Sequence, residues 1–216
     1  MMSAVPRPLV IVGCGGFGRE VRDIVSDLNA REPTWEFLGY LDDSPTPVNI
    51  DLLQRQGDRV LGGIDAYDDL PPDVSYVIGI GNGPVRRAID RRMTAAGRTP
   101  ATLIHPSVTH GFDVTFGPGS IVCAGVRLTT NIRLGRHVIL NLNVTVGHDS
   151  VLGDYVTINP LTAVSGWVTI GEASLMGTHS AVLQQLTIGA DSTVGSGACA
   201  VRDVPAGVIV KGVPAK

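Results

Sequence analysis

The chain has 216 residues, of which 44% are hydrophobic and 17% are charged, with a formal net charge of −3. This length fits one large or two small domains, and the scattered charge excludes a basic surface for nucleic acid or an anionic membrane. Cys14, Cys123 and Cys199 are an odd number without paired spacing, which argues against a disulfide framework or a zinc ribbon. Met1–Pro8 is too short and proline-rich for a signal peptide, and no stretch has membrane-spanning length, so we expect a cytoplasmic protein.

Residues 1–103 alternate strand and helix signals, which predicts a small parallel α/β domain. The predicted strands are short apolar runs at Leu9–Gly13, Trp35–Leu41, Tyr76–Ile80 and Ala101–Ile104. The predicted helices are Gly16–Leu28, with apolar residues at helical spacing, and Pro84–Ala96, for which Asn82 is the expected cap.

A glycine-rich loop joins the first predicted strand to the first helix. Gly13-Cys14-Gly15-Gly16-Phe17-Gly18 fits G-x-G-x-x-G, and Asp42 and Asp43 close the next strand. Taken alone, this pattern indicates a binding site for NAD. Residues 1–103 are too few for both halves of a dinucleotide fold, however, and a nucleoside diphosphate fits a helix N-terminus equally well. A second loop at a strand end contains Gly81 and Asn82 and would face the same cleft.

From Ile104 onward the chain follows a repeat of six residues. Fifteen successive positions spaced by six are apolar: Phe116, Val122, Leu128, Leu134, Leu140, Val146, Leu152, Ile158, Val164, Ile170, Met176, Val182, Ile188, Val194 and Ala200. Glycines follow this position at intervals of eighteen: Gly117, Gly135, Gly153, Gly171 and Gly189. Eighteen is three sixes, which predicts a triangular coil with three short strands per turn and the apolar position inside. We expect the glycines to relieve the backbone at turns. A β-sandwich, with strands and loops of variable length, would not hold this register.

The repeat, the glycine-rich domain before it and the ending Lys211-Gly212-Val213-Pro214-Ala215-Lys216 resemble the left-handed β-helix acyltransferases. Val10–Val21 and Gly147–Asp154 are similar to the family of sialic-acid O-acetyltransferases and bacillosamine-type N-acetyltransferases. The resemblance implies a Rossmann-like domain at 1–103 that binds a nucleotide-sugar. It implies a left-handed parallel β-helix at 104–216 that binds acetyl-CoA between the subunits of a homotrimer, without a metal.

His148 is the expected general base. It lies two positions past an inward one, so its side chain should face outward, and a neutral imidazole is suited to taking a proton from a nucleophile. The resemblance implies that Asp149 tunes this base and that Asn141 orients it. Neighbouring side chains on a strand face opposite ways, so the sequence leaves open whether Asp149 pairs with His148 of its own chain.

Gly166 matches the family position whose backbone N–H binds the acetyl oxygen in the transition state, although a plain corner glycine is an equal interpretation. Further acetyl-CoA contacts are expected from Gly171, Gly177, Lys211 and Pro214. Thr157 stands where some family members have a second histidine near the coenzyme.

Under this resemblance the nucleotide-sugar is expected at the two loops of the first domain, through Gly13, Gly15, Gly16, Phe17, Gly18, Asp42, Asp43, Gly81 and Asn82. A phosphate loop favours N-acetylation of a nucleotide-linked amino-deoxysugar, with O-acetylation of sialic acid as the alternative. UDP, TDP, GDP and CMP remain open.

Three further alternatives belong to other classes. A γ-type carbonic anhydrase would need His137, His148 and His179 to converge on zinc. A non-catalytic nucleotide-sugar sensor would leave the Gly-His-Asp stretch and the C-terminal signature unexplained. An NAD-dependent dehydrogenase is disfavoured by the size of the first domain.

Overall fold

The protein was analysed as a computed structural model that describes residues 5–216, so the first four residues of the predicted first domain lie outside the described residues. The chain divides into two compact units. The first runs through Gly81 and includes Ala88–Ala101, and the second contains Asn82–Arg87 and Thr102–Lys216. The two units therefore interleave in sequence around α3, whereas the sequence pattern predicts a single boundary between Leu103 and Ile104.

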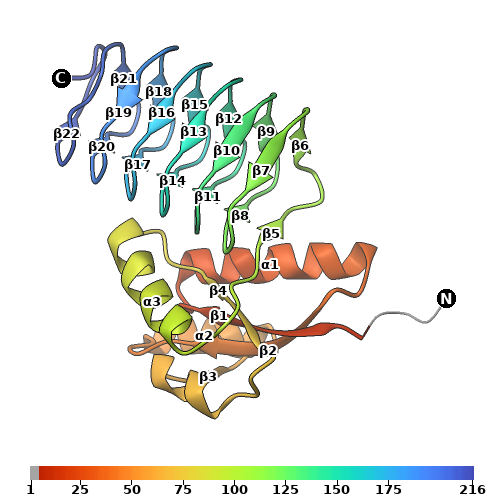
Figure 1. The fold of residues 1–216 in the computed structure, drawn as a ribbon. Helices are drawn as coiled ribbons and strands as arrows, with labels where there is room; N and C mark the ends of the chain where they lie inside the picture. The colour runs from red at the N-terminus through yellow and green to blue at the C-terminus, as the bar shows by residue number, and fades with distance from the viewer. Residues whose placement is uncertain (1–4) are drawn as a thin grey trace. The chain divides into compact units, whose positions relative to one another are not determined.

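The first unit is built on a four-stranded parallel sheet with strand order β3-β2-β1-β4 (Figure 1). Its strands are β1 (Arg7–Val12), β2 (Trp35–Leu41), β3 (Val60–Gly62) and β4 (Ser75–Ile78). Its helical segments are α1 (Gly16–Arg31), α2 (Pro47–Arg55), the 3₁₀-helix Ile64–Asp69 and α3 (Gly83–Ala95), whose first turn belongs to the second unit. This order is typical of the mononucleotide-binding half of a doubly wound fold, which confirms the predicted class.

Three elements of this unit were missed from the sequence, namely α2, β3 and the 3₁₀-helix Ile64–Asp69. Thr46 caps α2 by accepting a hydrogen bond from the Asn49 N–H at 3.2 Å, and Pro47 occupies the first turn. Both are known helix-start signals. In contrast, α1 was predicted because Val21, Ile24 and Val25 recur at helical spacing, and all three are buried.

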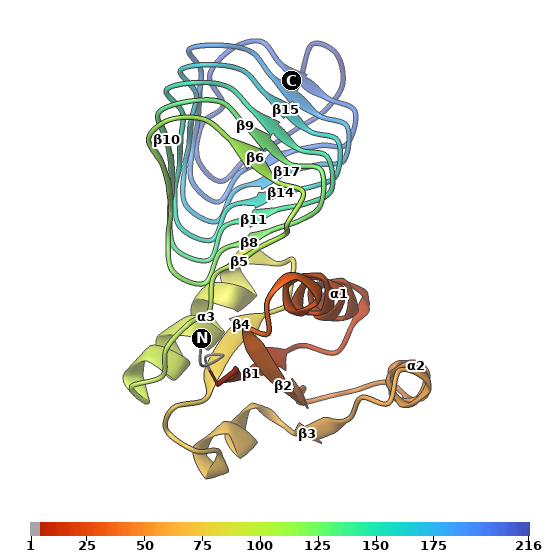
Figure 2. The same cartoon turned by 90° about the vertical axis from the view of Figure 1, so that its right-hand side faces the viewer.

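The second unit winds into a left-handed parallel β-helix, whose coils trace a three-sided outline in Figure 2. One sheet contains β7 (Val114–Phe116), β10 (Ile132–Leu134), β13 (Val151–Leu152), β16 (Thr169–Ile170) and β19 (Thr187–Ile188). The second contains β5 (Leu103–Ile104), β8 (Ile121–Val122), β11 (Ile139–Leu140), β14 (Thr157–Ile158), β17 (Leu175–Met176), β20 (Thr193–Val194) and β22 (Ile209–Val210). The third contains β6 (Thr109–His110), β9 (Arg127–Leu128), β12 (Thr145–Val146), β15 (Ala163–Val164), β18 (Ala181–Val182) and β21 (Cys199–Ala200).

Successive coils pair in a register of eighteen residues, as in Leu140 with Ile158 and Val146 with Val164. The predicted apolar positions form the core of the prism: all are buried except Phe116, which is half-buried. A second inward position often carries a hydroxyl, and the Ser150 Oγ donates to the Ser165 carbonyl of the next coil at 3.2 Å. The six-residue repeat therefore encodes both the core and its internal hydrogen bonds.

The corners of the prism follow the same register. Each corner residue has a positive φ, in three columns spaced by eighteen: Gly119, His137, Tyr155, Ala173 and Asp191; Gly125, Asn143, Leu161, His179 and Gly197; Asp113, Asn131, Asp149, Trp167 and Gln185. The prediction that the periodic glycines relieve these turns was wrong. Gly117 and its equivalents do not have positive φ; a Cβ there would collide with the backbone of the next coil. Those glycines permit close stacking of the coils.

Candidate active site

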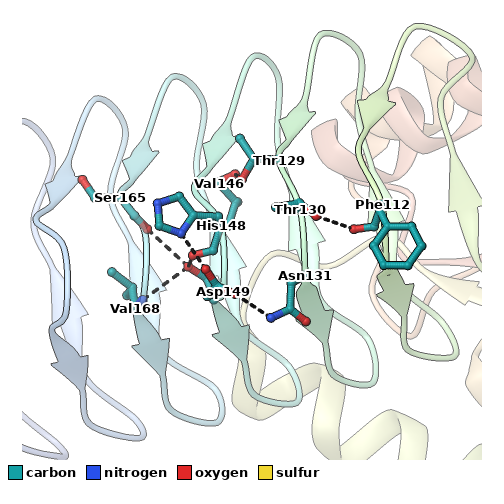
Figure 3. Close-up of polar contacts among 10 residues, drawn as sticks. Phe112, Thr129, Thr130, Asn131, Val146, His148, Asp149, Ser165 and Val168 are labelled. Atoms are coloured by element: carbon teal, nitrogen blue, oxygen red, sulfur yellow. Dashed lines mark hydrogen bonds and ion pairs between the residues drawn. The ribbon is translucent and has the colours of Figure 1, made fainter.

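One edge of the β-helix gathers polar side chains from three successive coils. We call it the His148 edge and define it as Asn131, His148, Asp149, Gly166 and Trp167. Asn131, Asp149 and Trp167 share the third column of corners, and His148 and Gly166 are the residues just before two of these corners. Figure 3 shows His148, Asp149 and Asn131 on adjacent coils, facing one another.

His148 and Asp149 pair directly within one chain. The His148 Nδ1 lies 2.7 Å from Asp149 Oδ2, and the imidazole is 52% exposed. The strand rule that left this pairing open does not apply, because Asp149 is a corner residue with φ of 58°, which turns its side chain back toward His148. In the neutral ring Nδ1–H donates to the carboxylate, which leaves the Nε2 lone pair free to accept a proton.

Asn131 completes this arrangement from the preceding coil. Its Nδ2 donates to Asp149 Oδ1 at 2.6 Å (Figure 3). The hydrogen bonds from Asn131 and from His148 together hold the pKa of Asp149 below its ordinary value, with the Asn131 bond as the larger cause. Asp149 is therefore a carboxylate throughout the neutral range, as a partner for imidazolium requires.

Gly166 lies one coil beyond His148, and its lack of a side chain makes room for the ring. A Cβ at Gly166 would lie 2.6 Å from His148 Nε2. Within residues 5–216 the Gly166 N–H has no hydrogen-bond acceptor. Trp167, 58% exposed, sets its ring edge-on to His148 with the centroids 6.5 Å apart. The His148 imidazole is thus flanked by a backbone N–H and an exposed aromatic ring.

Asn141 is not brought to His148 within the chain. Its Nδ2 donates to Asn159 Oδ1 at 3.3 Å, and the strand β12 separates it from the His148 edge. Thr157 is buried, and its Oγ1 accepts a hydrogen bond at 2.9 Å from Arg86, whose guanidinium also donates to the carbonyl of His137. Burial lowers the pKa of Arg86 to about 9.

The residues expected to bind acetyl-CoA are dispersed along the coils. Gly171 and Gly177 pack tightly, since a Cβ at either would collide with the backbone nitrogen of Ala190 or Ser196. Lys211 and Lys216 exchange backbone hydrogen bonds around the turn that contains Pro214. Close coil stacking therefore accounts for the two glycines.

The histidines required by the carbonic anhydrase alternative lie at three different edges of the prism. His137 is buried and stacks on Tyr155 with the ring centroids 5.9 Å apart, and His179 belongs to another column of corners than Asp149. Among the described residues 5–216, no group of three or more His, Cys, Asp or Glu side chains is arranged to hold a metal ion.

In the first unit, the predicted glycine loop joins β1 to the N-terminus of α1. Gly13 takes a φ of 96°, and a Cβ at Gly18 would collide with the Gly13 carbonyl, so Gly18 lets the helix approach the loop. Gly15 caps α1 without a side-chain hydrogen bond, no acidic residue lies in the first turn, and a Cβ at Gly15 or Gly16 would meet nothing within 4 Å. This helix start, with Phe17 half-buried beside it, can accept an anion.

Asp42 and Asp43 hold the loops around this helix start. Asp42 accepts hydrogen bonds from the backbone N–H of Cys14 and of Ser44, each at 2.9 Å, and Asp43 accepts one from Ile64 at 2.7 Å. Burial opposes ionisation of Asp42, but these backbone donors outweigh it and hold the pKa of Asp42 below its ordinary value. Burial, together with Asp42, raises the pKa of the Cys14 thiol to about 11, so Cys14 is not a thiolate nucleophile.

The second predicted loop is divided between two roles. A Cβ at Gly81 would meet nothing within 4 Å, so space is open there, whereas the Asn82 side chain caps α3 by accepting from the Val85 N–H at 3.0 Å. Sequence reasoning missed Arg19, whose Nη1 donates to the Cys14 carbonyl and to Asn49 Oδ1. It also missed Asn131, whose only signal is that it lies eighteen residues before Asp149.

Comparison with known proteins places both units in one family. Residues 8–93 match the family model of the PglD N-terminal domain. The GDP-perosamine N-acetyltransferase of Escherichia coli O157:H7 is 29% identical over 213 residues, which cover 95% of this chain and 94% of that protein. The acetyltransferase domain of PglB from Neisseria gonorrhoeae FA1090, solved with acetyl coenzyme A, is 33% identical with a TM-score of 0.87, covering 98% of this chain and 99% of that one. The chain belongs to the PglD-type nucleotide-amino-sugar acetyltransferases.

A third relative extends this similarity to a structure that holds both kinds of ligand. PerB from Caulobacter crescentus, solved with CoA and GDP-perosamine, is 29% identical with a TM-score of 0.82, covering 97% of this chain and 96% of that one. The predicted family, the α/β domain followed by a left-handed β-helix, and the acetyltransferase class are therefore confirmed. Every helix within residues 5–216 is too short or too polar to serve as a membrane span.

Proposed function

We propose that this protein transfers the acetyl group of acetyl-CoA to the amino group of a nucleotide-linked amino-deoxysugar, with His148 as the general base. The observation that carries this proposal is the His148 edge: an exposed imidazole whose Nδ1 is held by Asp149 and whose Nε2 is free of the chain's own carboxylates. Its relatives supply the substrate class, since one is named a GDP-perosamine N-acetyltransferase and another was solved with CoA and GDP-perosamine.

The reaction needs few groups from the protein. The sugar amine attacks the thioester carbonyl, a C–N bond forms, and Nε2 of His148 takes the proton that the nitrogen loses. The oxyanion that develops on the acetyl oxygen then collapses, the C–S bond breaks, and CoA leaves as a thiolate that recovers the proton. Asp149 stabilises the imidazolium that exists between these two proton transfers.

Gly166 is our candidate for the donor to that oxyanion. Its N–H lies next to the base and has no acceptor within residues 5–216, and a backbone donor already fixed in place stabilises developing charge without reorganisation. Free cysteines do not enter this scheme, because Cys14 and Cys123 are buried, and strands β15 and β18 separate Cys199 on β21 from β12, which precedes His148. We therefore favour direct transfer in a ternary complex over a covalent acyl-enzyme.

The α/β unit supplies recognition of the nucleotide. The N-terminus of α1 presents uncapped N–H groups beside Gly15 and Gly16, where the diphosphate can approach closely. Asp42 and Asp43, which shape the neighbouring loops, retain carboxylate lone pairs for a ribose or base. This division would leave the α/β unit to select the nucleotide and the β-helix to perform the transfer.

We further infer that the enzyme is a homotrimer of the cytoplasm. Asn141 and His148 lie on different edges of the prism, so one active site would obtain both only if two copies of the chain contribute to it. Exposed apolar side chains along these edges, Leu142 and Leu161 among them, suit contact with a second copy. Three free cysteines are typical of a reducing compartment.

One assay tests the proposal. Purified protein is mixed with acetyl-CoA and a panel of free sialic acid and UDP-, TDP-, GDP- and CMP-linked sugars with and without a free amine. Products are read by mass spectrometry and by release of the CoA thiol. We expect one amino sugar to gain one acetyl group, and the matching hydroxy-sugar to be inert. Thiol release only with a sialic acid would replace the proposal with O-acetylation.

A further inference from the structure

The two carboxylate oxygens of Asp149 have separate partners. Oδ2 lies 2.7 Å from His148 Nδ1, and Oδ1 accepts from Asn131 Nδ2 at 2.6 Å (Figure 3). Asn131 and Asp149 occupy the same corner of successive coils with nearly equal φ, 56° and 58°. The backbone fixes both corners, since the Asn131 N–H donates to Phe112 and the Asp149 N–H donates to Thr130. The Asn131 amide is therefore held in a position from which it donates to Oδ1 while Oδ2 faces His148.

We propose that Asn131 is a positioning residue for the acetyl transfer, holding Asp149 in the orientation that keeps His148 in its Nδ1–H tautomer with Nε2 available as the base. This inference rests on the proposed role of His148 in catalysis. Asn131 acts through Asp149 and does not itself face the reacting atoms. Without the amide, the half-buried carboxylate is free to rotate about its side-chain bonds, and both ring tautomers of His148 become populated.

Charge explains why an amide, and not a carboxylate, occupies this corner. Asp113 precedes Asn131 in the same column and Asp149 follows it, and adjacent coils are about 4.8 Å apart. Asp113 is ion-paired with Arg133 at 2.5 Å, so its charge is already compensated. A third carboxylate at position 131 would repel Asp149 and could not donate to it, whereas an amide donates without adding charge.

A purely structural explanation must be separated from this one. Asn is favoured at positive φ, and this preference alone would be a sufficient reason for Asn131 at this corner. Asp and Gly also accept this conformation, but neither donates a side-chain hydrogen bond to Asp149. Asn143 offers a matched control, because it is an exposed asparagine with φ of 58° in another column of corners.

The experiment compares Asn131→Asp and Asn131→Gly with Asn143→Asp and Asn143→Gly. The ring nitrogens of the five histidines are labelled with ¹⁵N, and the His148 signals are assigned by their loss in His148→Ala. Spectra at alkaline pH report the tautomer of the neutral ring, and thermal unfolding and steady-state kinetics are measured on the same samples.

We expect both Asn131 variants to lose most of the Nδ1–H tautomer and to lower kcat by about tenfold with little change in KM for acetyl-CoA. We expect the Asn143 variants to leave the His148 signals unchanged, and Asn131→Gly to unfold at the same temperature as Asn143→Gly. An unchanged tautomer in both Asn131 variants would overturn the inference. If the tautomer changes but no sugar in the panel is acetylated, the positioning of His148 stands and the proposed reaction fails.

Discussion

The α/β unit and the β-helix assemble functional groups in different ways. In the α/β unit they come from loops that follow different strands: the glycine loop follows β1, and Asp42 and Asp43 follow β2. In the β-helix they come from one corner repeated by successive coils, so Asn131, Asp149 and Trp167 are neighbours because they are eighteen residues apart. A repeat therefore converts a fixed sequence interval into spatial contact, and a loop-built site has no such interval.

Glycine also serves the two units differently. Gly18 has no side chain because the backbone of the loop lies where its Cβ would be. Gly166 has none because the ring of His148 from the preceding coil occupies that place. In the first case glycine permits a helix to approach the glycine loop, and in the second it permits the His148 side chain to lie close to the next coil.

The largest expected effect is that of His148→Ala, which should greatly reduce acetyl transfer by the β-helix without affecting nucleotide recognition by the α/β unit. His148→Ala removes the proton acceptor, so turnover should fall by ~10²–10⁴-fold. Binding of the nucleotide-sugar, measured by calorimetry, should be unchanged, because the phosphate loop lies in the other unit. A variant that retains its activity would remove His148 as the base, and weaker nucleotide binding would contradict the division of labour.

Gly166→Ala tests whether the His148 ring needs the space that Gly166 leaves in the β-helix. The new methyl group would lie 2.6 Å from the imidazole, so the ring must move, and displacement of a catalytic group by an ångström can lower turnover by about 10²-fold. Gly195→Ala is the control for stability, since its methyl would come no closer than 3.2 Å, to the Lys211 side chain, and 3.4 Å, to the Val210 carbonyl. If Gly166→Ala is as active as the parent protein, the close approach of the His148 ring to position 166 does not matter to the reaction.

The sequence alone predicted what the repeat determines. The inward apolar positions, the three-sided coil and the outward direction of His148 all follow from counting in sixes. The glycine loop was found because its steric demands are local: Gly13 needs a positive φ and Gly18 needs a close approach. Features of this kind are encoded within a few residues or in a strict period.

What escaped prediction depended on the corners. The rule of alternating strand side chains could not anticipate the pairing of Asp149 with His148, because residues 148 and 149 lie at a turn with positive φ. Asn131 was missed because its contact with Asp149 depends on both residues lying at the same corner of successive coils. The repeat of six does not by itself show which residues lie at the corners. Asn141 matched a family position, yet only the fold reveals that β12 separates it from His148.

Gly18→Ala is the corresponding test in the α/β unit. Its methyl group would collide with the Gly13 carbonyl, and overpacking of this kind costs about 1–3 kcal/mol, here directed at the loop and the start of α1. Gly16→Ala, where a methyl meets open space, should leave thermal stability unchanged or slightly raised. Equal unfolding temperatures for the two variants would show that the loop has room to adjust.

Acidification should remove the stabilising contribution of one carboxylate in each unit. Hydrogen bonds to Asp149 hold its folded pKa below the unfolded value, so its contribution to stability is present above about pH 4 and is lost as the pH falls through the folded pKa. The difference in unfolding temperature between the protein and Asp149→Asn should therefore shrink on acidification. Asp42→Asn should behave alike, because the Cys14 and Ser44 N–H groups lower the pKa of Asp42. A difference that is constant across the titration would contradict the hydrogen-bond argument.

The smallest expected effect concerns Trp167, the corner residue beside the base. A bulky aromatic side chain is an uncommon choice at a φ of 60°, and Asn adopts this conformation more readily, so stability does not explain Trp at this corner. Its exposed ring, next to His148, instead suits contact with a ligand.

Trp167→Asn should therefore retain or raise the unfolding temperature while raising KM for the acceptor by about 2- to 10-fold, the equivalent of ~0.5–1.5 kcal/mol of aromatic contact. Gln185→Asn, at the same corner one coil further, is the control and should change neither quantity. A fall in kcat with an unchanged KM would mean that Trp167 holds His148 and not the ligand. In that case side chains from both neighbouring coils, Asn131 and Trp167, would position His148, and the repeated corner would supply the whole support of the base.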